Sequence, residues 1–425
     1  MPMKRNLLYC LFLVAAATGS ARAADQSDFQ LKNGDRVVFY GDSITDQRLY
    51  TTFAETYVVT RFPKLDVTFV HSGWGGDRVT GGGGGPIDVR LKRDVFAYKP
   101  TVMSIMLGMN DGSYRAFDQK IFDTYANGFQ HIIDELKKNL PGLRLTLIEP
   151  SPYDDVTRPP TFGDGYNAVL VKYSEFVKEL AQREHQGVAD LNTPVVEALR
   201  KAYADDQKLA QKILPDRVHP GPAGHLLMAE ALLKSWNAPT VVTAVEIDAA
   251  AKTATRAEGT KVSQISASVS GLSWVQDDAA LPMAVDTADA TMSLALKSSD
   301  FVEAMDQEPL KVTGLAAERY SLKIDGSEVG SFTKEQLAAG VNLALLATPM
   351  LKQAMEVHKL TLQHNNIHFQ RWRQIQVPYA NDANEKVKHG AAELMSGLDE
   401  NEAGVVEQQR AKAQPVEHKY ELNAL

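Results

Sequence analysis

RVVFYGDSI, residues 36–44, is an apolar run that stops abruptly at a glycine and two polar residues. Three later runs have the same form, at residues 67–70, 102–107 and 143–148, and each gives way to small or polar residues. Nearly continuous apolar character is expected of strands that are covered on both faces in a parallel sheet. These runs therefore predict four strands of one parallel sheet.

Longer amphipathic stretches lie between and after these runs. Residues 122–140 place apolar side chains on one stripe at helical spacing, and residues 167–184 and 225–236 follow a similar pattern. Strands that alternate with helices predict a doubly wound α/β domain. In such a sheet, ligands bind beyond the carboxyl ends of the strands, so the loops after the runs are where chemistry is expected.

Four loops carry residues that fit nucleophilic catalysis: residues 41–45, 73–77 and 108–111, which follow the first three runs, and residues 216–220, near the end of the domain. The hydroxyl of Ser43 is a poor nucleophile unless a base removes its proton. His219 suits the base role because an imidazole titrates near working pH. Asp216, three residues earlier, can accept the other ring N–H and fix the tautomer. The predicted catalytic residues are Ser43, Asp216 and His219.

Attack on an ester carbonyl creates an oxyanion, which needs hydrogen-bond donors. The backbone N–H groups of Ser43 and Gly76 and the side-chain amide of Asn110 are the predicted donors. Taken singly, each motif also fits a turn, a helix cap, a loop glycine or a surface histidine. Together, the four motifs follow one another at predicted sheet ends and supply every role that the reaction requires.

Four further residues are candidates for substrate binding: Asp42, Trp74, Asp111 and Tyr153. Asp42 also fits a helix cap, and Asp111 a turn. Trp74 fits either an apolar or sugar-stacking wall or simple core packing. Tyr153 fits either a pocket wall or a turn.

The four motifs resemble the blocks of the SGNH (GDSL) hydrolase family. Gly41-Asp42-Ser43-Ile44, Gly76, Asn110 and the Asp216-to-His219 block match in order, over about residues 34–237. His71 departs from the family, which often has Asn there, and we take that position as structural. The resemblance implies a flavodoxin-like, three-layer α/β/α fold and ester hydrolysis through a serine acyl-enzyme, without a metal.

Three other features of the sequence fit a binding site less well. The glycines at 81–85 lack the Lys-Ser/Thr of a phosphate-binding loop, so a flexible active-site rim is favoured. His364 and His368 lack an adjacent Glu or a third ligand, and no metal or other cofactor is predicted. Arg90 and Arg93 fit solvated surface charges better than contacts to an acidic substrate.

The net charge and the N-terminal residues indicate which partners and which location to expect. The 425 residues carry a net charge of −8, which predicts no nucleic-acid partner. Residues 1–23 have a basic start, an apolar run and an Ala-x-Ala end, the pattern of a signal peptide and not of a permanent membrane anchor. Cleavage there would remove Cys10, the only cysteine, and three basic residues, changing the net charge to −11. We expect an exported protein, periplasmic or secreted.

The pattern of apolar residues changes after residue 240, where short alternating segments replace the long apolar runs. We expect a catalytic domain at 24–240, a β-rich accessory region at 241–330 and a helical C-terminal region at 331–425. Within these, Tyr320 to Ile324 followed by Asp325-Gly326 predicts a hairpin, Thr333 to Gln336 a helix-opening capping box, and residues 385–412 a helix. The role of residues 241–425 is not indicated by any motif.

The predicted function is that of an exported serine esterase. Its substrate is a small-molecule or glycan ester, and removal of acetyl groups from a carbohydrate is preferred over the alternative, a lysophospholipase-like lipase. Two further alternatives are acyl transfer to an acceptor other than water and a non-catalytic glycan-binding protein.

Overall fold

The computed structural model describes residues 28–425; the predicted signal peptide lies outside them. Its first sheet has five parallel strands in the order β2-β1-β5-β6-β7. They are β1 (Asp35–Gly41), β2 (Val67–Gly73), β5 (Val102–Met106), β6 (Arg144–Ile148) and β7 (Gly187–Ala189). The four predicted strands are confirmed, and the order is that of flavodoxin-like folds. β7 has three residues and was not predicted.

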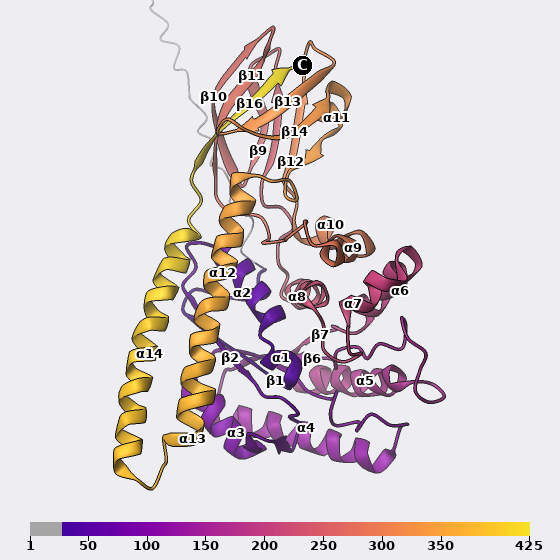
Figure 1. Cartoon of the computed structure of the whole chain (residues 1–425), viewed down its shortest axis with the longest axis vertical. Helices are drawn as coiled ribbons and strands as arrows, with labels where there is room; N and C mark the ends of the chain where they lie inside the picture. Colours follow the sequence, from indigo (N-terminus) through magenta and orange to yellow (C-terminus); the bar gives the residue numbers. More distant parts are fainter. Residues whose placement is uncertain (1–27) are drawn as a thin grey trace, which may run out of the picture.

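Helices cover both faces of this sheet (Figure 1). α2 (Leu49–Arg61) and α8 (Pro222–Ser235) pack together on one face, and α4 (Gln119–Asn139) and α5 (Tyr166–Glu184) on the other. The apolar stripe of α4 is buried, and Asp118 caps its first turn. The three-layer α/β/α fold predicted from the sequence is confirmed. This half also contains α1 (Ser43–Asp46), β3 (Gly81–Gly82), β4 (Gly85–Pro86), α3 (Ile87–Asp94), α6 (Thr193–Asp205) and α7 (Gln207–Ile213).

Two further sheets share a second hydrophobic core, and together they form the β region. One is ordered β10-β11-β16-β13-β14 and the other β15-β12-β8-β9. The predicted hairpin is β13–β14, and its turn residues Asp325 and Gly326 have φ of 49° and 79°. Positive φ at both central residues is what a tight hairpin turn requires. The strands are β8 (Ala244–Asp248), β9 (Thr253–Glu258), β10 (Thr260–Ser268), β11 (Gly271–Asp278), β12 (Pro309–Thr313), β13 (Arg319–Ile324), β14 (Ser327–Thr333), β15 (Val341–Asn342) and β16 (Glu417–Ala424).

The range predicted as β-rich also holds two helices, α9 (Ala290–Ser298) and α10 (Phe301–Met305). They pack against helices of the first half, and their apolar side chains belong to the core of the α/β domain. Asp289 starts α9 by accepting hydrogen bonds from the N–H groups of Thr291 and Met292. The capping box at Thr333 and Gln336 opens α11 (Lys334–Ala339), as predicted.

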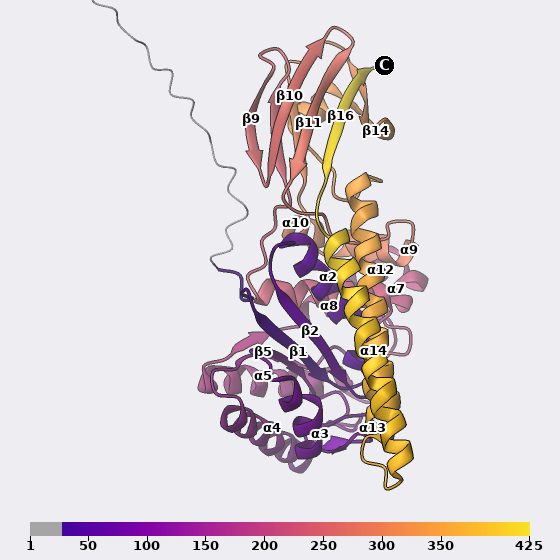
Figure 2. The same cartoon turned by 90° about the vertical axis from the view of Figure 1, so that its left-hand side faces the viewer.

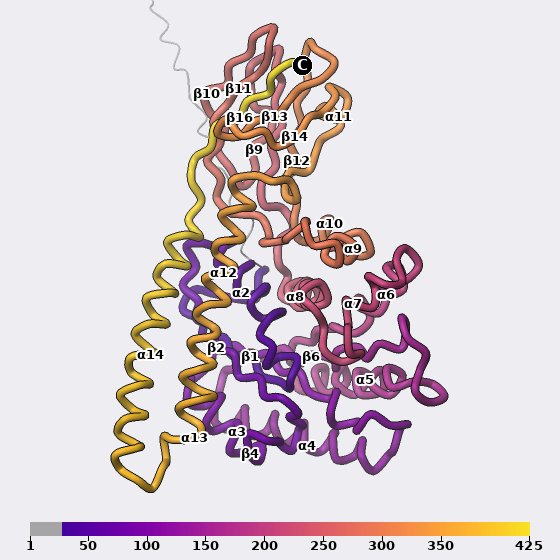
Figure 3. The backbone as a smooth tube through the Cα atoms, viewed as in Figure 1, coloured from indigo at the N-terminus to yellow at the C-terminus, as the bar shows by residue number. Residues whose placement is uncertain are grey.

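Residues 349–412 form a helical hairpin that runs alongside the α/β domain (Figure 2). This C-terminal hairpin consists of α12 (Pro349–Phe369), a π-helical turn (Gln370–Gln376), α13 (Val377–Tyr379) and α14 (Glu385–Lys412). α12 packs on α2 and β2, and α14 packs on α12. The chain then returns to the β region as β16, a strand that lies in the range predicted as helical (Figure 3). Among residues 28–425, no helix is long and apolar enough to cross a membrane.

Candidate active site

Ser43 stands at the turn between β1, an inner strand of the sheet, and the helical turn α1. Asp42 caps α1 by accepting a hydrogen bond from the N–H of Ile44 at 3.0 Å. A Cβ at Gly41 would lie 2.7 Å from the carbonyl oxygen of Met106 and would also meet Thr45. Because only glycine fits this close approach, the sequence Gly-Asp-Ser places the serine at the carboxyl end of β1.

The predicted catalytic side chains meet at this edge of the sheet. His219 Nε2 lies 2.8 Å from Ser43 Oγ, and His219 Nδ1 lies 2.8 Å from Asp216 Oδ2. Asp216 Oδ1 also accepts the backbone N–H groups of Val218 and His219. Burial opposes ionisation of Asp216, but the hydrogen bonds from His219 and Val218 outweigh it and lower the pKa of this carboxyl. The serine hydroxyl, the imidazole and the carboxylate thus form a continuous hydrogen-bonded chain.

The loop that carries Asp216 is held by the segment that follows Tyr153, for which the sequence indicated only a turn or a pocket wall. Arg158 donates to the carbonyl oxygens of Leu214 and Pro215 and pairs with Asp154 at 2.6 Å. Asp154 donates its backbone N–H to the carbonyl oxygen of Arg217. Arg158 was not predicted from the sequence, because the backbone oxygens that it binds lie more than fifty residues away.

The loops with the predicted oxyanion donors adjoin Ser43. The last residue of β1, Gly41, is paired with Gly73 in β2 and with Met106 in β5, so the loops after these strands start side by side. Gly76 has φ of +77°, a left-handed conformation that favours glycine. A Cβ at Gly75 would lie 4.0 Å from Ser43 Cβ. The glycine loop therefore passes next to the serine.

The side-chain amide of Asn110 is held by hydrogen bonds at both its nitrogen and its oxygen. Its Nδ2 donates to the carbonyl oxygen of Asp77 at 3.0 Å, which leaves the second hydrogen of the amide available. Its Oδ1 accepts from the hydroxyl of Tyr114 at 3.0 Å. Tyr114 was missed from the sequence, because only the left-handed backbone at Ser113 and Tyr114 turns that hydroxyl back onto Asn110.

The four candidates for substrate binding have partners within the chain. Asp42 and Asp111 are buried, and burial raises the pKa of each carboxyl to about 7. Asp111 accepts the backbone N–H of Val79 at 3.0 Å. Trp74 is buried, with its ring edge-on to Trp372. Tyr153 is half-buried beside Tyr114 and Tyr166.

Arg90 corrects a sequence prediction. It was expected to be a solvated charge or a contact for an acidic substrate, but its side chain is fully buried. It pairs with Asp77 at 2.8 Å and with Asp94, and it donates to the carbonyl oxygen of Ser72. Buried charges persist when they are paired and hydrogen-bonded in this way. Arg90 thereby fixes the loop that carries Gly76.

The glycine run at residues 81–85 forms the small β3–β4 hairpin. A Cβ at Gly84 would lie 2.7 Å from the ring of Trp74 and 2.6 Å from the side chain of Arg90. The glycines thus allow backbone to lie directly against these two side chains.

His364 and His71 belong to a buried network of ion pairs. Glu55 of α2 lies 2.6 Å from His364 Nε2 and 3.2 Å from His71 Nε2, and Glu402 of α14 lies 3.5 Å from His364 Nδ1. Burial alone would lower the pKa of His364, but the two carboxylates raise it to about 9. No group of three or more ligating side chains in residues 28–425 could hold a metal ion.

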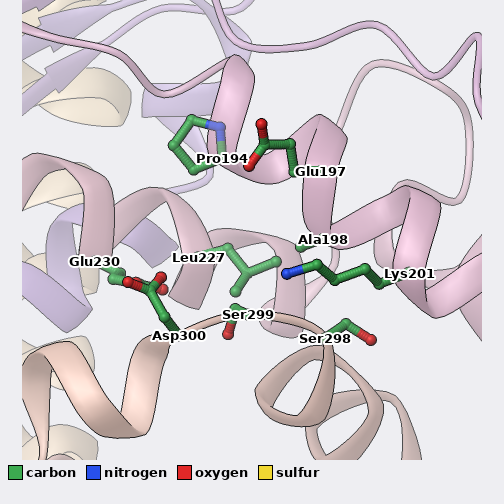
Figure 4. Close-up of a pocket in the computed structure, with 9 residues that line it drawn as sticks. All are labelled: Pro194, Glu197, Ala198, Lys201, Leu227, Glu230, Ser298, Ser299 and Asp300. Carbon is green, nitrogen blue, oxygen red and sulfur yellow. The ribbon is translucent and has the colours of Figure 1, made fainter.

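A separate pocket of about 210 Å³ lies among α6, α8 and the segment between α9 and α10 (Figure 4). None of the residues that line it belongs to the four motifs. Glu230 and Asp300 at this pocket are both paired with Lys234.

Residues 39–227 match the family described as the GDSL-like lipase/acylhydrolase family. These residues form a GDSL-like lipase/acylhydrolase domain. The resemblance predicted from the four motifs is confirmed, and the protein is a carboxylic ester hydrolase.

Two similar proteins cover different parts of this chain: one covers about half of it, and the other nearly all of it. An acetylxylan esterase of Geobacillus stearothermophilus is 25% identical over 230 residues, which are 48% of this chain and 95% of that protein. The solved structure of a gut microbial diltiazem-metabolizing enzyme is 28% identical, with a TM-score of 0.80. That similarity covers 93% of this chain and 98% of the other, so it includes the β region and the C-terminal hairpin.

Proposed function

We propose that the GDSL-like domain removes acetyl groups from a carbohydrate through a Ser-His-Asp acyl-enzyme mechanism. The observation that carries this proposal is the pair of 2.8 Å contacts of His219, one to Ser43 Oγ and one to Asp216 Oδ2. A serine, a base within hydrogen-bond reach and a carboxylate that orients the base are the parts of an activated nucleophile.

In the first half-reaction, His219 Nε2 takes the proton of Ser43 as Ser43 Oγ bonds to the acetyl carbon. The negative charge moves to the carbonyl oxygen, where the N–H groups of Ser43 and Gly76 and the free amide hydrogen of Asn110 receive it. The intermediate collapses by breaking the bond to the sugar oxygen, which takes the proton from His219. Asp216 keeps the imidazole in one tautomer throughout and stabilises its charged form.

In the second half-reaction, water attacks the acetylated serine. His219 takes a proton from the water and then returns it to Ser43 Oγ as acetate leaves. Asp216 is more than half exposed, and His219 is about one-third exposed, so the base is open to solvent. This exposure favours water as the acceptor over acyl transfer to a second alcohol.

The carbohydrate part of the proposal is supported by the acetylxylan esterase relative, which aligns over 95% of its own length. Of the predicted substrate-binding residues, we propose that Tyr153 contacts the sugar, because its ring is only partly buried. We propose that Asp42, Asp111 and Trp74 do not touch the sugar, and that they affect its binding indirectly by fixing the conformation of the loops around the site.

The decisive experiment compares Ser43→Ala with the wild-type protein on p-nitrophenyl acetate and on an acetylated xylo-oligosaccharide. We expect nearly complete loss of both activities with an unchanged circular dichroism spectrum. A fluorophosphonate probe should label the wild type at Ser43 and leave the variant unlabelled. Retained hydrolysis by the variant would refute the mechanism, because another group would then carry the reaction. A wild-type protein that is both unlabelled and inactive would favour the non-catalytic glycan-binding alternative.

A second candidate substrate class is an ester of a drug-like small molecule. The observation in its favour is the chain-wide similarity to the diltiazem-metabolizing enzyme, which extends through the C-terminal hairpin. Turnover of diltiazem and of an acetylated xylo-oligosaccharide should be compared at equal concentrations. A kcat/KM that is tenfold higher for diltiazem would replace the carbohydrate proposal, and a strong preference for long acyl esters would favour the lipase alternative.

We also propose export, with cleavage after Ala23. The support is the sequence pattern of residues 1–23. Mass spectrometry of the protein purified from its native source should give an N-terminus at Ala24. An intact Met1 would contradict export by this route.

A further inference from the structure

The π-helical turn of the C-terminal hairpin lies against the loop that carries Gly76. This turn, Gln370–Gln376, follows α12 directly. π-helical turns are rare, and they often occur where a helix meets a functional site. Two of its side chains, Trp372 and Arg373, reach the GDSL-like domain.

Trp372 anchors the turn in that domain. Its side chain is buried, and its ring N–H donates to Asp94 of α3 at 2.6 Å. Its ring meets the ring of Trp74 edge-on, with 5.7 Å between the centroids. Trp74 is two residues before Gly76, so the hairpin touches the glycine loop beside its proposed oxyanion donor.

Arg373 makes the second contact with this loop. The central carbon of its guanidinium lies 3.0 Å from the centroid of the Trp74 ring, within the range of a cation–π interaction. The Trp74 ring is packed from the other directions by Gly84 and Arg90. Arg373 therefore completes, with Gly84 and Arg90, the set of contacts that hold the Trp74 ring in place.

The same guanidinium also acts on Asp46, the last residue of α1. Burial raises the pKa of the Asp46 carboxyl, and the charge of Arg373 is the strongest influence that opposes this. Asp46 Oδ2 accepts the backbone N–H of Gly75 at 3.2 Å. The ionised carboxylate thus holds the residue next to Gly76, and Arg373 favours the ionised form.

We propose that Arg373 is a positioning residue for ester hydrolysis. Through Trp74 on one side and Asp46 on the other, it holds the glycine loop so that the N–H of Gly76 points at the developing oxyanion. Nη1 of Arg373 is buried and has no hydrogen-bond partner in the described part of the chain, so its action is exerted through charge and stacking. The inference rests on the proposed mechanism, and it gives the C-terminal hairpin a part in catalysis.

The experiment compares Arg373→Met with Arg371→Met. Arg371 is on the same π-helical turn, but its guanidinium pairs with Asp399 of α14. We expect Arg373→Met to lower kcat by about 10- to 100-fold, because small misplacement of catalytic groups has effects of this size. KM should stay within about twofold, since the acyl and sugar contacts are unchanged. Arg371→Met should leave kcat at the wild-type level.

Two further measurements separate positioning from folding. Arg373→Lys keeps the positive charge and should recover a substantial part of kcat, whereas loss of a merely structural contact would lower the thermal midpoint without this recovery. A wild-type kcat in Arg373→Met, or an equal loss in Arg371→Met, would overturn the inference. Ser43→Ala is assayed in parallel: if that variant stays active, the proposed mechanism fails, and the two failures are thereby distinguished.

Discussion

His364 of the C-terminal hairpin lies 2.6 Å from Glu55 of the GDSL-like domain, and both side chains are almost wholly buried. The pair joins residues that are 309 positions apart. Glu402 of α14 is paired with the other ring nitrogen of His364, Nδ1. His71 of β2 is paired with the other carboxylate oxygen of Glu55, Oε2. The hairpin is therefore docked by charge as well as by apolar packing.

This docking should weaken as the pH rises. The pKa of His364 is about 9 in the folded protein against 6.5 for a free histidine. The resulting stabilisation, roughly 3 kcal/mol, is fully present below pH 6.5 and is lost as the pH rises through 9. The thermal midpoints of the wild type and His364→Gln should therefore differ most near pH 6 and converge by pH 9.5. His389→Gln, an exposed control on α14, should follow the wild type throughout; a gap that is constant with pH would contradict the prediction.

Asp216→Asn should leave the shape of the catalytic loop but remove the carboxylate that orients His219. The amide can present a donor to Nδ1 and stabilise the wrong tautomer, with no negative charge to support the imidazolium. We expect kcat to fall by about 10²- to 10⁴-fold with little change in KM. Steady-state kinetics on p-nitrophenyl acetate measure this. A loss of less than threefold would show that Asp216 is not the orienting group.

Asn110→Ala should lower kcat by about 10²- to 10³-fold, because one oxyanion donor is lost. Tyr114→Phe is the matched variant: the amide stays, and only the hydroxyl that fixes Oδ1 is removed. We expect this second loss to be about tenfold, since the amide can still adopt the productive orientation part of the time. If the tyrosine variant were impaired more than the asparagine variant, Asn110 would not be the donor.

Gly73→Ala should damage both stability and activity. Its new Cβ would lie 2.7 Å from the backbone Cα of Asp46, so β2 or α1 must shift. Overpacking of this kind costs about 1–3 kcal/mol, and the shift would separate the glycine loop from Ser43. Gly163→Ala, where nothing lies within 4 Å of the added carbon, is the control. The free energy of unfolding, measured by chemical denaturation, and kcat should both fall in Gly73→Ala. Both should stay at the wild-type level in Gly163→Ala.

The sequence carried most of the information on the GDSL-like domain. Strands that are buried on both faces are continuous apolar runs, so β1, β2, β5 and β6 could be predicted directly. The positions of the three motifs that follow β1, β2 and β5 could be inferred from that prediction, because parallel strands bring their carboxyl ends to one edge. The block from Asp216 to His219 lies between α7 and α8, so its place at this edge did not follow from the strands.

What the sequence did not reveal depends on how side chains meet in the folded protein. Arg90 is buried because Asp77 and Asp94 neutralise it, and the i,i+4 spacing of Arg90 and Asp94 is equally typical of exposed pairs on a helix surface. Trp74 and Arg373 are about three hundred residues apart, so no local pattern joins them. β16 did leave a signal in the sequence. The buried residues His418, Tyr420 and Leu422 alternate with more exposed residues, but the high polarity of the segment hid this alternation.

The place of β16 also bears on how the protein folds. The strand is the middle one of its sheet, paired with β11 on one side and with β13 on the other. During synthesis, both neighbouring strands emerge from the ribosome more than ninety residues before β16 does. Until then they lack their shared partner and present open edges, which attract other chains. This sheet can therefore be completed only after residues 417–424 have been translated, and a nascent chain stalled before residue 417 should be prone to aggregation.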